Sequence, residues 1–108
     1  MSYDQLVDRV HFMVYGDDAW RASIVKGADG TPEICYDVHG MTAKKAVQSL
    51  EDLVKVCRSP MVLEVIHGFN HGTAIKDSLN SVSFDDRIVN KYSPENNPGV
   101  TFFTLQSA

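Results

Sequence analysis

The most regular hydrophobic pattern in the chain lies between residues 43 and 57, where apolar side chains recur every three or four positions. Such spacing places the apolar side chains on one face of an α-helix. The stripe consists of Ala43, Ala46, Val47, Leu50, Leu53, Val54 and Cys57. Thr42 precedes it, and a threonine at that place can cap the first turn of a helix. The pattern therefore predicts a helix with one buried face.

Two β-compatible segments of strand length flank this helix. Residues 33–38 are bounded by Pro32 and Gly40, and residues 61–66 are apolar at nearly every position. A nearly continuous apolar run is typical of a central strand that is covered on most of both faces. A strand, a helix and a strand in this order predict a right-handed crossover, which leaves the two strands parallel in one sheet.

The last third of the chain predicts a shorter helix and a hairpin. Thr73 can cap this helix, and Ile75 and Leu79 then face inward. Residues 87–92 and 100–105 predict two strands that are joined by turn residues. The expected architecture is an α/β (α+β) two-layer sandwich, with a βαβαββ mixed sheet whose helices lie mainly on one face.

The N-terminal part of the chain carries weaker patterns. Residues 3–14 favour a helix, and Asp17 can cap a second helix that ends near Gly27. The stretch 27–32 contains two glycines and a proline and breaks the pattern. The expected organisation is a helical N-terminal extension, residues 1–30, followed by a main domain, residues 31–108. The extension is expected either to pack on the domain or to mediate self-association into a homo-oligomer.

Size and charge narrow the class of protein. With 108 residues the chain suits one domain with one modest core. No apolar run approaches the roughly 20 residues that span a bilayer, and no secretory signal is visible, so a cytoplasmic location without membrane contact is expected. Cys35 and Cys57 are predicted to stay reduced. The net charge of −4 argues against a nonspecific duplex binder, so a nucleic-acid site must be a local patch.

The carboxyl ends of the two predicted parallel strands carry the candidate chemistry. Asp37 and His39 lie at the end of the first strand, and His67 follows the second. Ligands of open α/β sheets tend to bind at this edge. Asp37 can accept a hydrogen bond from His39 or His67, and a His–Asp pair is a reasonable acid/base unit for hydrolysing a phosphodiester. The alternative is that each histidine is a structural hydrogen-bonding group, which is the commoner role near a strand end.

A phosphate-binding patch is expected beside these residues. Glycines let the backbone come close to a ligand, and a helix N-terminus offers free N–H groups to a phosphate. The predicted binding residues are Gly68, Asn70, His71, Gly72, Thr73, Lys44 and Lys76. The alternative is that the glycines serve only the turn and the lysines form only a solvated helix face. Three histidines without local ligand spacing are a weak signal for zinc, so no metal ligand is predicted.

Four segments in a fixed order carry a resemblance to a known family. Asp37-Val38-His39-Gly40 ends the first strand, and His67-Gly68 follows the second. Gly72-Thr73-Ala74-Ile75-Lys76 and Asn97-Pro98-Gly99-Val100-Thr101 come later in the chain. Together they resemble the Smr (small MutS-related) domain, which has an L-D-x-H motif at its first strand and an H-G-x-G motif after its second. The resemblance spans about residues 33–106.

The resemblance implies a domain that acts on nucleic acid. It implies either an endonuclease on DNA or RNA or a domain that only binds nucleic acid, and a divalent metal such as Mg²⁺ or Mn²⁺ is an implied cofactor. By this resemblance Asp37 and His39 stand for the Asp and His of the first motif, and His67 and Gly68 begin the second. Tyr36 and Asn70 depart from the motifs. Asn70 stands where the second motif has its last glycine, and Gly72 can take over that role in a longer loop.

Three functional hypotheses follow. The leading one is a weak endonuclease on DNA or RNA, with Asp37, His39 and His67 as its catalytic residues. The second is a nucleic-acid-binding module without catalysis, which the acidic charge and the altered second motif favour. The third is a protein-interaction domain that binds its partner through the N-terminal extension.

Overall fold

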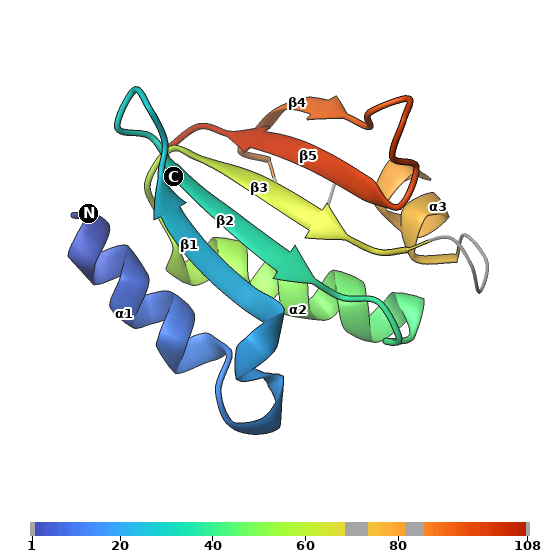
Figure 1. Ribbon diagram of the computed structural model, residues 1–108, viewed down its shortest axis with the longest axis horizontal. Helices are drawn as coiled ribbons and strands as arrows, with labels where there is room; N and C mark the ends of the chain where they lie inside the picture. Colours follow the sequence, from blue (N-terminus) through green and yellow to red (C-terminus); the bar gives the residue numbers. More distant parts are fainter. Residues whose placement is uncertain (1, 69–73, 82–85, 108) are drawn as a thin grey trace.

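Within the described residues, five strands form one sheet that is accompanied by helices (Figure 1). The computed structural model describes residues 2–68, 74–81 and 86–107. The elements are α1 (Tyr3–Met13), a 3-10 helix (Gly16–Arg21), β1 (Ala22–Lys26), β2 (Pro32–Asp37), α2 (Ala43–Val56), β3 (Met61–Ile66), α3 (Ala74–Ser81), β4 (Ile88–Tyr92) and β5 (Val100–Leu105). From β2 onward, the type and order of the elements are as the sequence predicts.

The sheet has the strand order β1-β2-β3-β5-β4. β2 and β3 run parallel, with Asp37 opposite Ile66, and the other neighbouring strands run antiparallel. This pairing confirms the predicted crossover through α2, the central position of β3 and the hairpin formed by β4 and β5. The carboxyl ends of β2 and β3 therefore lie at the same edge of the sheet.

Buried side chains from the helices meet one face of the sheet. Figure 1 shows α2 running behind the strands and α1 beside β1. In β2 the alternate residues Ile34 and Tyr36 are buried, whereas Cys35 and Asp37 on the opposite face are only partly covered. The helices contribute Leu6, Val10, Ala46, Leu50, Leu53, Val54, Ile75 and Leu79 to the same core. This layering confirms the predicted mixed sheet with helices mainly on one face.

The first predicted helix is confirmed as α1. Ser2 caps it, because the Ser2 hydroxyl accepts a hydrogen bond from the Gln5 amide at 3.2 Å. The Gln5 side chain accepts one in return from the Ser2 amide at 2.9 Å. This reciprocal pair satisfies two backbone donors at the helix start.

No helix in the part of the chain that the structure describes is long and apolar enough to cross a membrane.

The second predicted helix is wrong. Residues 16–21 form a 3-10 helix, and β1 follows as an edge strand antiparallel to β2. Pairing with β1 provides hydrogen-bond partners for the backbone N–H and C=O groups along the outer edge of β2, which would otherwise be exposed without partners. The turn between the strands is closed by the Gly27 amide, which donates to the Thr31 carbonyl at 2.8 Å. The segment predicted as an N-terminal extension thus supplies a helix and a strand that pack with the rest of the sheet.

A buried arginine joins the end of α2 to the C-terminal strand. Arg87 is 9% exposed and donates to the carbonyl oxygens of Val54 and Cys57 at 2.7 and 2.9 Å. It also donates to the carbonyls of Ser59 and Gln106, each at 2.8 Å. The last carbonyls of a helix have no partner inside the helix, and a cation near them is favourable. Arg87 therefore stabilises the C-terminus of α2 and the connection to β3.

We expect Arg87→Met to lower the free energy of unfolding by about 2–4 kcal/mol, because it leaves several buried carbonyl groups without a donor. Urea unfolding followed by circular dichroism measures this change. Arg58→Met is the matched control, since Arg58 is exposed and its substitution should stay within about 0.5 kcal/mol of the original protein. Equal stability of the two variants would show that Arg87 does not hold this end of α2.

Candidate active site

The parallel pairing of β2 with β3 continues for one residue beyond both strands. The Val38 amide donates to the Ile66 carbonyl at 2.9 Å, so the two chains leave the sheet side by side. A methyl group added to Gly68 would lie 3.7 Å from the Cβ atom of His39. The two sequence motifs, which lie 28 positions or more apart in the chain, therefore meet at one edge of the sheet, as predicted.

Asp37 and His39 form a hydrogen-bonded pair at this edge. The His39 Nδ1 atom lies 2.5 Å from Asp37 Oδ1, and the His39 backbone amide donates to the same oxygen at 3.0 Å. The His39 side chain is 57% exposed and the Asp37 side chain 18% exposed. The carboxylate is thus largely covered while the imidazole stays open to solvent, so a ligand can reach the ring.

The hydrogen bond determines which His39 nitrogen is free. An ionised carboxylate only accepts hydrogen bonds, so Nδ1 must carry a proton, and in the neutral ring Nε2 then presents its lone pair. Within the described residues Nε2 has no hydrogen-bond partner. This is the arrangement in which a carboxylate orients an imidazole so that the far nitrogen can take up a proton.

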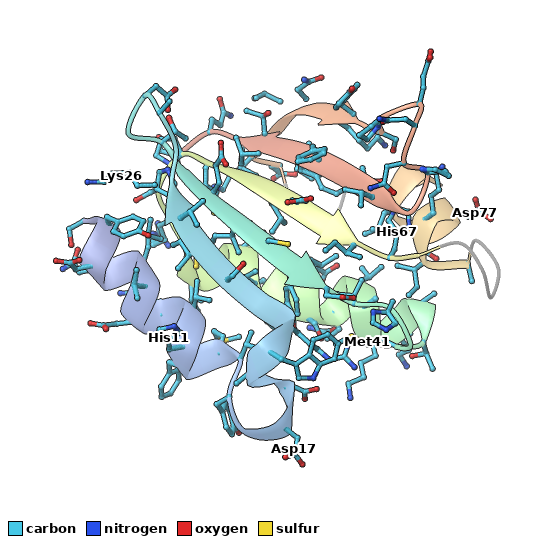
Figure 2. All side chains as sticks on the ribbon, in the orientation of Figure 1. His11, Asp17, Lys26, Met41, His67 and Asp77 are labelled. Carbon is cyan, nitrogen blue, oxygen red and sulfur yellow. The ribbon has the colours of Figure 1, made fainter. Side chains whose placement is uncertain are left out.

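His67 has a different environment. It lies where β3 ends (Figure 2), and only 5% of its surface is exposed. Its Nδ1 atom lies 2.9 Å from the Gly68 carbonyl and its Nε2 atom 2.9 Å from the Thr101 hydroxyl. Because a carbonyl only accepts, Nδ1 donates, and in the neutral ring Nε2 accepts from Thr101. Both ring nitrogens are therefore engaged, and the catalytic role assigned to His67 stays a prediction.

Gly68 begins the segment that follows β3. Its φ of +72° is a backbone conformation that glycine adopts without strain. Its amide donates to the Gly99 carbonyl at 3.0 Å, and the His67 amide donates to the same oxygen at 2.9 Å. The Gly68 N–H group is thus already paired and is not free to bind a phosphate. Gly68 would help a phosphate to bind only by letting it come close to the backbone, since the residue has no side chain.

The remaining predicted binding residues divide into two groups. Lys44 is exposed in the first turn of α2, and Lys76 is partly exposed in α3. Lys44 lines a shallow surface depression together with Thr42, Lys45, Gln48 and Ser49. Asn70, His71, Gly72 and Thr73 lie outside the described residues.

Two residues that the sequence reading missed, Trp20 and Arg21, border the site. Arg21 Nη1 donates to the carbonyl oxygens of Asp37 and His39, both at 3.1 Å. Its Nε atom donates to the Asp18 carboxylate at 2.9 Å. The Arg21 guanidinium lies 4.6 Å from the centre of the Trp20 ring, and the Trp20 and His39 ring centres are 5.8 Å apart. In the sequence, the adjacent aromatic and cationic residues at 20 and 21 are the feature that could have indicated a binding role. The pattern there predicts a helix instead.

The cysteines are poor candidates for a nucleophile. Burial raises the pKa of the Cys35 thiol to about 11, and the nearby Glu64 carboxylate adds to the effect. Burial likewise raises the pKa of the Cys57 thiol to about 11. Because the thiolate is the reactive form, both residues are almost entirely unreactive near neutral pH. Both are free thiols, in keeping with the prediction that they stay reduced.

The described side chains do not match the requirements of a resident metal ion. In residues 2–68, 74–81 and 86–107, no three His, Cys, Asp or Glu side chains gather as potential ligands. A tightly held divalent cation needs several such donors, and Asp37 with His39 supplies only two. Asp37 and His39 alone would therefore hold a divalent ion only weakly.

Comparison with known proteins supports the fold assignment. No family model and no curated protein matches the chain. Among solved structures, the chain is similar to the crystal structure of the Smr domain of Thermus thermophilus MutS2, with 21% sequence identity and a TM-score of 0.56. The match covers 67% of this chain and 96% of that one. The predicted resemblance is thus confirmed at the level of structure: the chain has the fold of an Smr domain.

Proposed function

We propose that this chain is a nucleic-acid-acting Smr-type domain that hydrolyses phosphodiester bonds, with Asp37 and His39 as its acid/base pair. The observation that carries the proposal is the hydrogen bond between Asp37 and the exposed ring of His39. It lies at the carboxyl ends of two parallel strands, where open α/β sheets bind their ligands. The chain also has the fold of the Smr domain of MutS2, and the Smr resemblance of its sequence implies action on nucleic acid.

The chemistry needs one proton to move in each direction. A water molecule attacks phosphorus and gives a proton to His39 Nε2, while the bond from phosphorus to the leaving sugar oxygen breaks. The imidazolium then returns that proton to the leaving oxygen. Asp37 keeps the ring oriented and stabilises the imidazolium that forms between the two steps.

Neighbouring residues have supporting roles in this proposal. Lys44 and Lys45 in the first turn of α2 attract the phosphate backbone, and Lys76 adds charge from α3. Gly68 allows close approach beside His39. His67 positions the segment after β3 through its bonds to Gly68 and Thr101. Asn70, His71, Gly72 and Thr73 complete the phosphate-binding set as predicted from the sequence.

A specific observation favours a second candidate, a binding module without catalysis. Both nitrogens of His67 are engaged, so among the imidazoles at this edge that the structure describes only His39 has an unpaired nitrogen. If a single imidazole with an unpaired nitrogen does not suffice for catalysis, the chain binds nucleic acid without cleaving it. Binding would then weaken steeply with added salt and persist in an Asp37→Ala variant.

Cleavage assays test the proposal directly. Single-stranded RNA and supercoiled or branched DNA are incubated with the chain, with magnesium, with manganese and with a chelator. Asp37→Ala and His39→Ala should each lower the rate by about 10²–10⁴-fold, because each removes one part of the same acid/base unit. The double variant should be no slower than the worse single variant, since residues that act as one unit are not additive.

His11→Ala is the matched control for this assay. His11 is exposed on α1, and its removal should leave the cleavage rate unchanged. Equal product from the original chain and the Asp37→Ala, His39→Ala double variant would reject the endonuclease proposal. Binding that persists with no cleavage in any condition would favour the binding module.

The tautomer of His39 provides a second, spectroscopic test. Long-range ¹H–¹⁵N NMR spectra, recorded at a pH where the imidazoles are neutral, should show the proton of His39 on Nδ1. Asp37→Ala removes the acceptor and should abolish this preference, while the His11 signals stay unchanged. A His39 ring that carries its proton on Nε2 in the original chain would contradict the orienting role of Asp37.

A further inference from the structure

An exposed aromatic ring lies beside the proposed proton-transfer group. The Trp20 side chain is 59% exposed, although tryptophan side chains in folded globular proteins are largely buried on average. Its ring centre is 5.8 Å from the ring centre of His39, and the two planes are tilted by 59°. The ring therefore adds an open apolar surface next to the only described imidazole at this edge with a free nitrogen.

Arg21 fixes the position of this ring. The guanidinium lies 4.6 Å from the Trp20 ring centre, within the range of a cation–π contact. The guanidinium donates three hydrogen bonds, one to the Asp18 carboxylate and two to the carbonyl oxygens of Asp37 and His39. The Arg21 side chain is accordingly only 16% exposed. Trp20 is thus tied to the same backbone that positions His39, and little ordering is needed when a ligand arrives.

Other exposed aromatic side chains lack these features. Phe12 is 80% exposed and Tyr15 is 73% exposed, but within the described residues neither ring pairs with an imidazole ring or forms a cation–π contact. The combination of an open ring, a fixed cation and a neighbouring acid/base group is found at Trp20. It provides what a nucleotide needs: a flat surface for the base and a reactive group for the phosphate beside it.

We propose that Trp20 is a stacking subsite for an unpaired nucleobase, which makes single-stranded nucleic acid the substrate class of the Asp37–His39 site. This inference rests on the proposed function. In a duplex the flat faces of the bases are covered by their neighbours, so a side chain cannot stack on them, whereas unpaired bases stack readily on aromatic rings. One sugar joins a base to its phosphate. A base on Trp20 therefore brings an adjacent phosphate to His39.

Tryptophan fluorescence gives a direct readout, because Trp20 is the single tryptophan of the chain. Three probes are compared: a short single-stranded oligonucleotide, the same sequence as a duplex, and an abasic strand of equal length. We expect the single strand to quench the fluorescence strongly. The abasic strand has the same phosphates but no bases, so it should bind more weakly and leave the emission nearly unchanged.

Affinity measured by anisotropy of a labelled oligonucleotide gives the second readout. Trp20→Ala should weaken binding of the single strand by about 5- to 150-fold, which corresponds to the loss of one stacked base. Trp20→Phe keeps an aromatic ring and should recover part of that loss. Tyr15→Ala, which removes another exposed aromatic ring, is the matched control and should bind like the original chain. Circular dichroism confirms that each variant folds.

The outcomes separate this inference from the proposed function. If the chain binds or cleaves nucleic acid but Trp20→Ala equals the original chain, the subsite is wrong and the function stands. The same holds if duplex and single strand quench Trp20 equally. If no probe binds and no substrate is cleaved, the proposed function fails and the subsite fails with it.

Discussion

The parallel pairing of β2 with β3 is the constraint on which the candidate site depends. Their register sets Asp37 opposite Ile66, and the ladder continues with the bond from Val38 to Ile66. A slip of one residue would turn the buried face of β2 outward and move Asp37 into the core, where a carboxylate without a partner is costly. The burial of Ile34, Tyr36 and Val38 therefore fixes the outward position of the Asp37–His39 pair.

Arg21 is a second constraint, and it links the N-terminal segment to the same edge. Strand ends usually lead into loops in which carbonyl groups face solvent, and such loops are mobile. Here the Arg21 guanidinium donates hydrogen bonds to the carbonyls of Asp37 and His39, and the Asp18 carboxylate balances its charge. The backbone that carries the imidazole is thereby tied to the 3-10 helix. The first 30 residues thus help to order the site as well as the core.

Much of the fold could be predicted because α2, β3 and β5 each bury a continuous face, which leaves a clear period in the sequence. β1 was not predicted because it is a five-residue edge strand that is stabilised by its pairing with β2. The Asp37–His39 pair was predictable locally, since Asp37 ends β2 and His39 follows it by two positions. The burial of His67 was not, because its partner Thr101 comes from a strand 34 positions away. Contacts of Arg21 across 16 and 18 positions are equally invisible to local pattern.

The overall charge of the chain bears on the role proposed for Trp20. Affinity for nucleic acid without sequence preference comes mainly from phosphate contacts, and it requires a surplus of cations. This chain carries a net charge of −4, and Arg21, the cation that donates to the carbonyls of Asp37 and His39, is already paired with Asp18. A nucleic acid bound as proposed at this edge would therefore gain part of its binding energy from contacts that do not depend on charge. Stacking on an aromatic ring, worth roughly 1–3 kcal/mol per base, is such a contact, and it is open to unpaired bases alone.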